Sequence, residues 1–282
     1  MVVSLIALGG FGEVGRNCLA VDINGKIILL DMGFHLERYL DVTEDDFHLK
    51  RHGLRKLMNA GALPDIRKLG RRKRDIIAVL CSHAHLDHIG ALPFLAKQLR
   101  CPVFATPFTA HVIRSLLDDK HVFLDVVDKS PGSSFIVDGV KIEFIPVSHS
   151  TPQTVAIAIH TPSGVIIYAN DYKEDRNPPF GLPTDTKRLS SFSGSVRALV
   201  LDSLYAPTVD TSPGESLARQ SLLSLADDLK DSRAIVISTF SSHIFRLESI
   251  CDLADRLGRQ VVFLGRSLNR YIQSAKHAGI VD

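Results

Sequence analysis

The sequence predicts a mixed α/β protein in two parts, with one domain in residues 1–205 and part of a second domain in residues 206–282. Two features of the pattern support this division. In the first part, β-rich runs are joined by short glycine turns, which is typical of antiparallel hairpins. In the second part, strand-like and helix-like runs alternate, which is typical of a parallel α/β unit. A chain of 282 residues with 45% hydrophobic residues can also bury a large core.

The first part is dominated by strands. The dipeptides Asn24-Gly25 and Asp138-Gly139 favour two-residue hairpin turns, because both residue types tolerate a positive φ. We expect strands at Val3–Leu8, Cys18–Ile23, Lys26–Leu30, Asp75–Cys81, Pro102–Ala105, Ser134–Val137, Lys141–Val147, Val155–Ile159, Val165–Ala169 and Ala198–Asp202. We expect helices at Arg51–Ala60, Ala91–Leu99 and Pro107–Leu117, the last with Thr106 as its N-cap and Pro107 at its first position.

The second part has a different texture. After a Pro-containing stretch at Pro207–Pro213, a polar helix is expected to run through Lys230. Further along the chain we expect a strand, a helix, a second strand and a second helix, at Ala234–Ser238, Phe245–Leu257, Val261–Leu264 and Leu268–Ala278. The change in texture places a domain boundary near residue 205.

The net charge of +2 argues neither for nor against a polyanionic partner. Only one strong local cluster of charge is found, at residues 67–74, where six of eight residues are Lys or Arg. Two interpretations of this cluster remain open, a solvated loop or helix end and a surface that contacts phosphates.

Cysteine usage and hydropathy predict an intracellular protein. The four cysteines are widely spaced, which suits small buried thiols better than a disulfide framework: Cys18, Cys81, Cys101 and Cys251. No apolar stretch approaches the roughly 20 residues that span a bilayer, and the start of the chain lacks the features of a cleaved leader. We therefore expect no membrane association and a cytoplasmic location.

The strongest functional signal is the segment His83-x-His85-x-Asp87-His88, which directly follows an apolar run. Imidazole and carboxylate groups are the ligand types that suit zinc and related transition metals. Alternation along an extended chain lets His83 and His85 point the same way, whereas Asp87 and His88 lie beyond a turn and can face a second ion. A surface histidine cluster is the bland alternative. It is disfavoured because the apolar run Ile76–Leu80 precedes the segment and a helix follows it.

Three residues outside this segment, each at the end of a predicted strand, could complete the site. His149 follows Lys141–Val147 and Asp171 follows Val165–Ala169. Each could also be an ordinary polar residue that caps a strand or begins a turn. Asp31, after Lys26–Leu30, is better placed to orient a ligand histidine than to bind a metal directly.

The glycine run Gly10-x-Gly12-x-x-Gly15 matches the dinucleotide-binding pattern, but a strand follows it where that pattern requires a helix. We therefore exclude a nicotinamide site. The glycines indicate a backbone turn, either near the metal site or in a plain hairpin.

The ordered set of these residues resembles the metallo-β-lactamase superfamily and, within it, the ribonuclease J family in its archaeal form. The resemblance covers essentially the whole chain and rests on long motifs in the right order: Ala7–Asn17, Asp31–Phe34, Asp87–Ala91, Ser148–Ser150, Thr239–His243 and Gly265–Ser267. It implies a metallo-β-lactamase αββα sandwich followed by the beginning of an α/β β-CASP domain, a nucleic-acid-specific insertion.

The resemblance also implies roles for individual residues. His83, His85 and His149 would hold one metal ion, Asp87 and His88 the other, and Asp171 would bridge them. Asp31 would support a ligand histidine, and Asp202 matches the first acidic motif of the β-CASP group. Asp87, Asp171 and His88 would be the catalytic residues, with two zinc ions, or alternatively manganese or magnesium, as the cofactor. Possible RNA contacts are Ser241, Ser242, His243, Arg266 and Ser267.

The activity that the resemblance implies is hydrolysis of RNA phosphodiesters. Two metal ions about 3.5–4 Å apart can activate a water molecule and stabilise the charge that develops on the phosphate. The expected mode is 5′-to-3′ exonuclease, with endonuclease activity left open, and the expected substrate is single-stranded RNA with a 5′ monophosphate. A homodimer is also expected from the family.

The sequence departs from the family pattern at its C-terminal end. Two later histidine-bearing segments should follow Gly265–Ser267, and this chain stops at Asp282. We therefore expect a fragment of a longer enzyme, with an incomplete second metal site and an exposed apolar patch where the missing last strands of the sandwich belong. A naturally short relative that closes its core through an oligomer, and a degenerate member that binds RNA without cutting it, remain alternatives.

Two other functions compete with the ribonuclease. A small-substrate hydrolase of the lactamase or thioesterase type could use the same sandwich, and a non-catalytic module could bind RNA alone. Residues 205–282 favour a nuclease over the first, because a small-substrate enzyme has no need of this additional segment.

Overall fold

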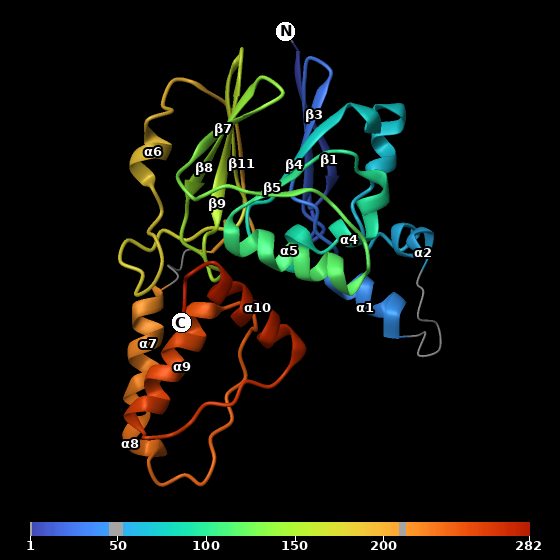
Figure 1. Cartoon of the computed structure of the whole chain (residues 1–282). Helices are drawn as coiled ribbons and strands as arrows, with labels where there is room; N and C mark the ends of the chain where they lie inside the picture. Colours follow the sequence, from blue (N-terminus) through green and yellow to red (C-terminus); the bar gives the residue numbers. More distant parts are fainter. Residues whose placement is uncertain (1, 45–52, 209–212) are drawn as a thin grey trace.

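The computed structural model describes residues 2–44, 53–208 and 213–282 of the chain. Its centre consists of two sheets that face each other (Figure 1). Sheet A runs in the order β1(Val3–Gly9), β2(Cys18–Ile23), β3(Lys26–Leu30), β4(Ile76–Leu80), β5(Val103–Ala105), β6(Val126–Asp128). Sheet B runs in the order β11(Val196–Leu201), β10(Gly164–Ala169), β9(Val155–Thr161), β8(Val140–Pro146), β7(Ser134–Val137).

Both sheets are mixed, and their pairing follows the turns in the sequence. In sheet A, β1, β2 and β3 are antiparallel, and β3 to β6 are parallel. In sheet B, β7 to β10 are antiparallel, and β11 joins β10 in parallel. The hairpin turns predicted at Asn24-Gly25 and Asp138-Gly139 are confirmed, because all four residues have positive φ, at 52°, 93°, 46° and 83°.

Alternating side chains of the strands build separate apolar layers. In β2, Leu19 and Val21 point between the sheets, where they join Phe144 and Ile157 of sheet B. Cys18 and Ala20 of the same strand face the other way, into a layer that helices cover. A third layer, under Phe192, covers the outer face of sheet B. Helix, sheet, sheet and helix therefore stack in that order, and the predicted αββα sandwich is confirmed.

Short helices connect the strands of the sandwich. They are α1(Leu36–Glu44), α2(Leu54–Asn59), the 3-10 segment η1(Ile66–Asp75), α3(Leu86–Ile89), α4(Leu92–Leu95), η2(Ala96–Gln98), α5(Pro107–Asp119) and α6(Thr186–Ser190). The helix expected over residues 91–99 is split into α4 and η2, and α3 precedes it. The helix expected at 51–60 is present as α2 within the described residues, which exclude Arg51. Helices α1 and α6, segment η1 and strand β6 were not predicted.

The last part of the chain is helical and packs beside the sandwich (Figure 1). It contains α7(Glu215–Ser224), α8(Ala226–Leu229), α9(Ile244–Arg256) and α10(Arg266–His277). Helices α7 and α9 pack against each other, and α10 packs on α5 of the sandwich. Tyr271 and Ala275 of α10 are buried in the layer beneath sheet A. None of the helices in the described part of the chain is both long and apolar enough to cross a bilayer.

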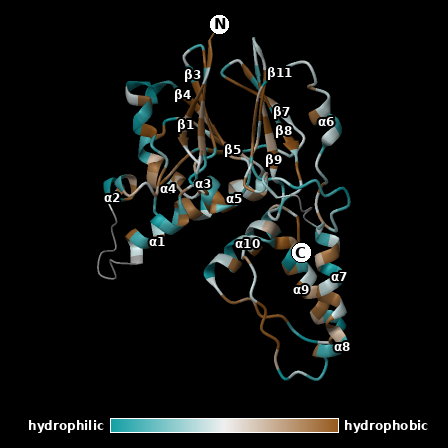
Figure 2. Ribbon diagram, turned by 180° about the vertical axis from the view of Figure 1, so that it is seen from behind, coloured by the Kyte–Doolittle hydropathy of each residue, from teal (hydrophilic) through white to brown (hydrophobic). Residues whose placement is uncertain are grey.

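The prediction of two strands in this last part of the chain is wrong. Residues 234–238 and 261–264 have no strand assignment, and no strand pairs with them among the described residues. Figure 2 shows apolar residues on the connections at this end of the molecule, and Val236 and Leu264 are 95% and 79% exposed. An apolar run becomes a strand only when a neighbouring strand takes up its backbone hydrogen bonds. Both runs therefore leave apolar side chains exposed at this end of the molecule.

Candidate metal centre

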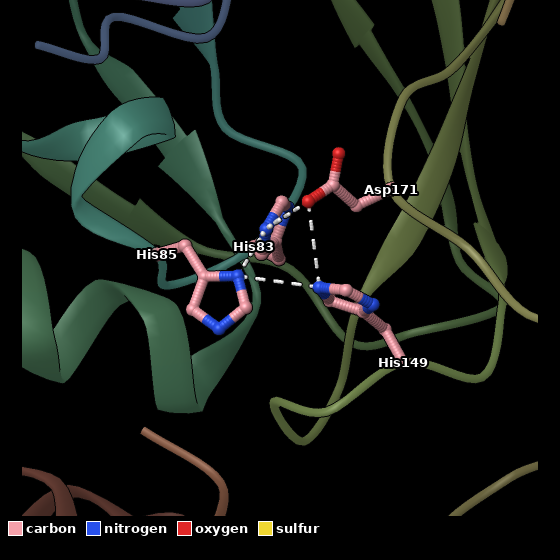
Figure 3. A group of neighbouring side chains, drawn as sticks. All are labelled: His83, His85, His149 and Asp171. Atoms are coloured by element: carbon pink, nitrogen blue, oxygen red, sulfur yellow. Dashed lines mark hydrogen bonds and ion pairs between the residues drawn. The ribbon is translucent and has the colours of Figure 1, made fainter. Parts of the chain in front are cut away.

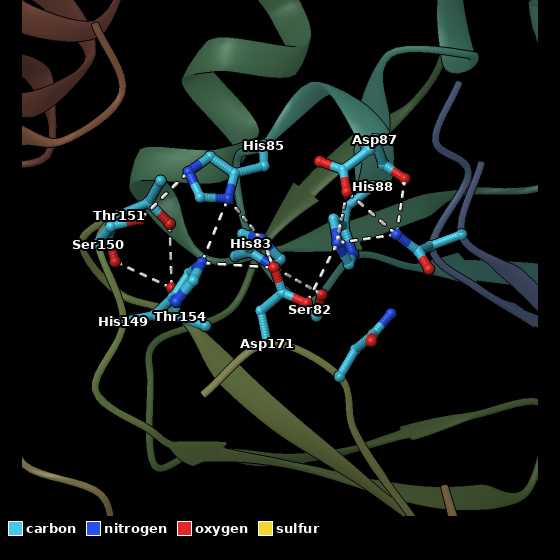
Figure 4. Close-up of polar contacts among 12 residues, drawn as sticks. Ser82, His83, His85, Asp87, His88, His149, Ser150, Thr151, Thr154 and Asp171 are labelled. Atoms are coloured by element: carbon cyan, nitrogen blue, oxygen red, sulfur yellow. Dashed lines mark hydrogen bonds and ion pairs between the residues drawn. The ribbon is translucent and has the colours of Figure 1, made fainter. Parts of the chain in front are cut away.

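The residues predicted for the metal site come together at one edge of the sandwich (Figure 4). Strands β3 and β4 are parallel and end at this edge, where Asp31 and His83 follow them. In sheet B, β8 and β10 both run antiparallel to β9, so that their ends also meet. His149 follows β8 and Asp171 follows β10. The topology therefore converts strand ends far apart in the sequence into one cluster.

Three histidines and one aspartate form the tightest group (Figure 3). The Nε2 atom of His83 lies 3.0 Å from Nδ1 of His85, and Nε2 of His149 lies 3.2 Å from the same nitrogen. Oδ2 of Asp171 lies 3.6 Å from Nε2 of His83 and 3.5 Å from Nε2 of His149. Potential ligand atoms of all four residues lie within 4.8 Å of one another. We call His83, His85 and His149 the three-histidine cluster.

The chemistry of the three-histidine cluster fits a metal ion. Burial lowers the pKa of all three histidines, that of His85 to about 4, and the neighbouring histidines lower those of His83 and His149 further. The rings are therefore neutral at pH 7, which is the form that binds metals. A neutral ring offers one N–H donor and one lone pair, so Nδ1 of His85 cannot satisfy two facing nitrogens at once. A shared cation would satisfy all of them.

Asp31 is the buried anchor of the neighbouring histidine, His88. Its carboxylate accepts hydrogen bonds from the backbone N–H of Ser82 at 2.7 Å, from Oγ of Ser82 at 2.8 Å and from the hydroxyl of Tyr168 at 2.8 Å. Nδ1 of His88 lies 2.7 Å from the same carboxylate. Asp31 is fully buried and has a φ of 57°, a conformation that Asp tolerates better than most residues. The predicted role of Asp31 in orienting a histidine therefore agrees with these contacts.

The other ring nitrogen of His88, Nε2, faces three polar side chains beside the three-histidine cluster. Nε2 lies 3.0 Å from Nδ2 of Asn17, 3.4 Å from Oδ2 of Asp87 and 3.6 Å from Oδ1 of Asp171. Burial alone would lower the pKa of His88, but the negative charges of Asp87 and Asp31 outweigh burial and raise it well above its usual value. His88 and Asp87 thus lie beside the three-histidine cluster without belonging to its tightest set of ligand atoms.

Asp171 lies between the two groups. Its Oδ2 faces the three-histidine cluster and its Oδ1 faces His88. Burial raises its pKa to about 6 against the opposing effect of His88, and the carboxylates of Asp87, Asp202 and Asp31 add to the rise. The pKa of Asp87 is instead lowered to about 2, because the charge of His88 outweighs burial. Two acids at one edge therefore have pKa values on opposite sides of the usual range.

Backbone packing fixes the turn that carries Asp87 and His88. A Cβ atom on Gly33 would lie 1.4 Å from the carbonyl oxygen of Asp87, so only glycine fits at this crossing. The backbone N–H of Asn17 donates to the same carbonyl at 3.0 Å. Gly15, with a φ of 88°, lies against the side chain of Asp87. The glycine run predicted as a backbone turn therefore lies directly behind the metal edge.

A cavity of about 430 Å³ opens beside His149 and reaches the last part of the chain. It is lined by groups of both parts, among them Ser150, Lys173, Glu215, His243 and Phe245. Glu215 accepts two hydrogen bonds from Arg246, at 2.7 and 3.0 Å, and lies 3.4 Å from Nε2 of His243. Helix α10 also contacts the metal edge directly. The hydroxyl of its Tyr271 donates at 2.9 Å to the carbonyl of Ala84, which lies between His83 and His85 in the sequence.

The other predicted residues lie at different distances from this edge. His243 lines the cavity, Ser242 is buried and Ser241 is partly buried next to it. Arg266 and Ser267 are exposed at the start of α10. Asp202 is exposed after β11, where its carboxylate accepts from the backbone of Leu204 at 2.8 Å. It nevertheless lies close enough to raise the pKa of Asp171.

Several residues that shape the site were missed from the sequence. Tyr168 lies inside an apolar strand, and its hydroxyl could have been flagged because a buried tyrosine needs a partner. Asn17 closes the glycine run and binds both Asp87 and His88. Tyr271 and Ser82 carried no signal, because one is far away in sequence and the other is a common residue at a strand end.

Comparison with known proteins agrees with this geometry. The family model of the metallo-β-lactamase superfamily matches residues 11–228, and the model of the ribonuclease J β-CASP domain matches residues 232–282. The chain is 34% identical to ribonuclease J of Pyrococcus abyssi over 99% of its own length and 63% of that protein. It is 36% identical to ribonuclease J of Methanocaldococcus jannaschii over 100% of its length and 64% of that protein. The predicted resemblance is confirmed.

A solved structure also shows the fold. A protein of unknown function from Enterococcus faecalis superposes with a TM-score of 0.68 and 17% identity, over 96% of this chain and 67% of the other. This likeness supports the architecture alone. The chain spans a little under two thirds of the length of the two archaeal relatives, at 63% and 64%.

Proposed function

Because this chain belongs to the metallo-β-lactamase superfamily, we propose that it contributes the metal-dependent active site of a ribonuclease that hydrolyses RNA phosphodiesters. The observation that carries the proposal is the placement of Asp171, whose two carboxylate oxygens face two separate groups of potential ligands. The match of residues 232–282 to a ribonuclease J β-CASP domain and the two archaeal relatives support RNA as the substrate.

We assign the ligands to two metal ions. His83, His85 and His149 would hold one ion, Asp87 and His88 the other, and Asp171 would serve both. Zinc suits this set of imidazoles and carboxylates, and manganese is the main alternative. When bound, such ions supply Lewis-acid stabilisation of the phosphate and lower the pKa of water.

The residues of the chain would perform the remaining tasks. Asp171, whose two carboxylate oxygens face both groups of ligands, can orient a water molecule between them. Asp87 stays ionised and fixes the position of His88 through the contact at 3.4 Å. In the adjoining cavity, Lys173 can bind a phosphate, and the stacked rings of Phe180 and Phe245 offer an apolar surface for a base.

The last part of the chain favours a nucleic-acid substrate over a small one. We place the domain boundary near residue 205, because the last strand ends at Leu201 and the described elements after it are helices. Helix α9 places His243 in the cavity wall, where Glu215 holds it. A small-substrate hydrolase of the same sandwich fold is the competing function, and the cavity shared between the two parts counts against it.

A cleavage assay tests the proposal. The purified chain is incubated with single-stranded RNA that carries a 5′ monophosphate, with zinc or manganese, and in parallel with a chromogenic β-lactam. His83→Ala should abolish cleavage, whereas His121→Asn should not, because His121 is exposed far from the cluster and its φ of 51° suits asparagine. Early release of the 5′-terminal nucleotide from RNA labelled at that end would indicate the 5′-to-3′ mode, and internal fragments would indicate an endonuclease. Turnover of the lactam alone would overturn the proposal.

A further inference from the structure

The surface formed by α2 and η1 carries the densest positive charge of the described chain, and the metal centre does not use it. Six of its basic side chains define what we call the α2–η1 surface: Arg55, Arg67, Lys68, Arg71, Lys73 and Arg74. In Figure 1 the two segments lie beside sheet A, and in Figure 2 hydrophilic residues alternate with hydrophobic ones along them. Ile66 and Leu69 anchor η1 in the core, so the charges are held on an ordered surface.

Few of these charges are neutralised within the described part of the protein. Arg55 and Arg71 are exposed and have no ion-pair partner among the described residues. Arg74 lies 3.7 Å from Asp75, but its side chain is 82% exposed. Arg67 is paired at 2.7 Å with Asp65. Exposed arginines of this kind are free to form bidentate contacts with a phosphate.

A shallow, open hollow adjoins the basic side chains. It has a volume of about 530 Å³ and is lined by Leu54, Arg55, Met58, Asn59 and Arg67. Its wall therefore combines two guanidinium groups with the apolar side chains of Leu54 and Met58 and one amide. A guanidinium can bind a phosphate while the apolar side chains contact the neighbouring sugar or base.

A chain of contacts joins the hollow to the metal centre. Just after α2, the carbonyl of Gly61 accepts from Nη1 of Arg38 at 3.3 Å. Glu13 binds both Arg38, at 3.1 Å, and Arg16, at 2.6 Å. Asn17, next to Arg16, binds Asp87 and His88. These contacts therefore connect the glycine run, which lies behind the metal edge, with the residues that follow α2.

We propose that the α2–η1 surface binds the sugar–phosphate backbone of single-stranded RNA at nucleotides away from the bond that is cut. This inference rests on the proposed function. Several exposed arginines on one surface can contact several phosphates of a nucleic acid, and the apolar wall of the hollow can contact a base or sugar. An anionic membrane surface fits less well, because the described part of this surface adds no exposed large apolar side chain that could insert.

Binding measurements in a chelator test the inference without any need for cleavage. The triple variant Arg55→Ser, Arg71→Ser and Arg74→Ser is compared with the wild type on a single-stranded RNA of about 30 nucleotides. The affinity should fall roughly tenfold near 0.1 M salt, and the slope of log K against log salt should decrease by about 2, as expected for three phosphate contacts to a single strand. Circular dichroism checks that the variant is folded.

The matched control removes the same charge from scattered exposed positions, with Arg100→Ser, Lys230→Ser and Arg256→Ser. This variant should keep the wild-type affinity and salt slope. Equal RNA binding by the two triple variants would overturn the inference, as would a loss by the first variant on phosphatidylserine vesicles with none on RNA. Loss of RNA binding in a chain that fails to cleave would support this surface while counting against the proposed function.

Discussion

The two groups of potential ligands at the metal edge differ in what holds them. In the three-histidine cluster, the ring nitrogens face one another at 3.0 and 3.2 Å, and the carboxylate of Asp171 lies farther from them, at 3.5 and 3.6 Å. His88, by contrast, has Asp31 at 2.7 Å on one nitrogen and Asn17 at 3.0 Å on the other. Ring nitrogens that converge in a largely buried site are costly without a cation, whereas His88 is already paired with the carboxylates of Asp31 and Asp87.

Because of this difference, the two ions should be held with unequal strength. The three-histidine cluster needs an ion to be satisfied and offers neutral rings for it. The group of Asp87 and His88 must give up contacts with Asn17, or share them, before it can bind an ion. We therefore expect the first ion to be retained more firmly than the second.

His83→Ala should have the largest effect, because it removes a ligand from the firmly held ion. We expect the rate of RNA cleavage to fall on the order of 10³-fold or more, with loss of at least one bound ion. Metal content by mass spectrometry and the cleavage rate are measured together. His88→Ala should leave one ion bound, so release of both ions in that variant would contradict the unequal strengths.

Asp31→Asn should have the next largest effect. The substitution keeps the shape of the side chain but removes the charge that orients His88, and such supporting groups are typically worth 10- to 100-fold in metal affinity. The loss should fall on the second ion, as measured by competition with a chelator. Asp22→Asn is the control, because Asp22 pairs with Arg72 at the far end of sheet A. An equal loss of affinity for both ions would show that Asp31 supports the whole site.

Acid should separate the two groups in the metal-free protein. The pKa values of His83, His85 and His149 are lowered on folding, that of His85 to about 4, so below about pH 6.5 the unfolded chain binds more protons and stability falls. The pKa of His88 is raised, so its contribution is fully present below pH 6.5 and is lost as pH rises through its folded value.

Unfolding in urea at about pH 7.5 and pH 5.0 measures this contrast. His149→Gln should make the free energy of unfolding less sensitive to acid, because one buried neutral ring is removed. His88→Gln should make it more sensitive, because a group with the opposite sign is lost. The same change in both variants would show that the two groups do not differ in charge.

Tyr168→Phe should have the smallest effect. It removes one of the donors to Asp31 and leaves the backbone and hydroxyl of Ser82 in place. We expect the free energy of unfolding to fall by about 0.5–1.5 kcal/mol and the affinity for the second ion to change less than in Asp31→Asn. A calorimetric scan and the chelator competition are the measurements. A loss as large as that of Asp31→Asn would assign the orienting role to the tyrosine.

The sequence was informative where local pattern and strand ends decide the structure. The dense segment of His83, His85, Asp87 and His88 could be recognised because few other roles require such residues together. His149, Asp171 and Asp31 could be placed because each follows an apolar run, and strand ends of one sheet meet at one edge. Contacts made by Asn17, Tyr168 and Tyr271 could not be predicted, since they depend on how distant elements pack.

The errors have a physical cause as well. Residues 234–238 and 261–264 have the apolar character of strands, but hydropathy does not reveal whether a neighbouring strand is present. The helix predicted over residues 91–99 changes after Leu95 from the α-helix α4 to the 3-10 segment η2, whose hydrogen bonds follow a tighter pattern. In both cases the sequence indicates the local type of structure, but it does not show which backbone hydrogen bonds can form.

The hydroxyl of Tyr271, bonded to the carbonyl of Ala84 between two cluster histidines, offers an optical reporter for the metal loop. The chain has five tyrosines and no tryptophan, so its intrinsic ultraviolet emission comes from tyrosine alone. Tyr168, the partner of Asp31, is a second buried emitter at the same edge. Titration with an ion can thus be followed in the unlabelled protein, with Tyr271→Phe and Tyr168→Phe assigning the signal to each side of the site.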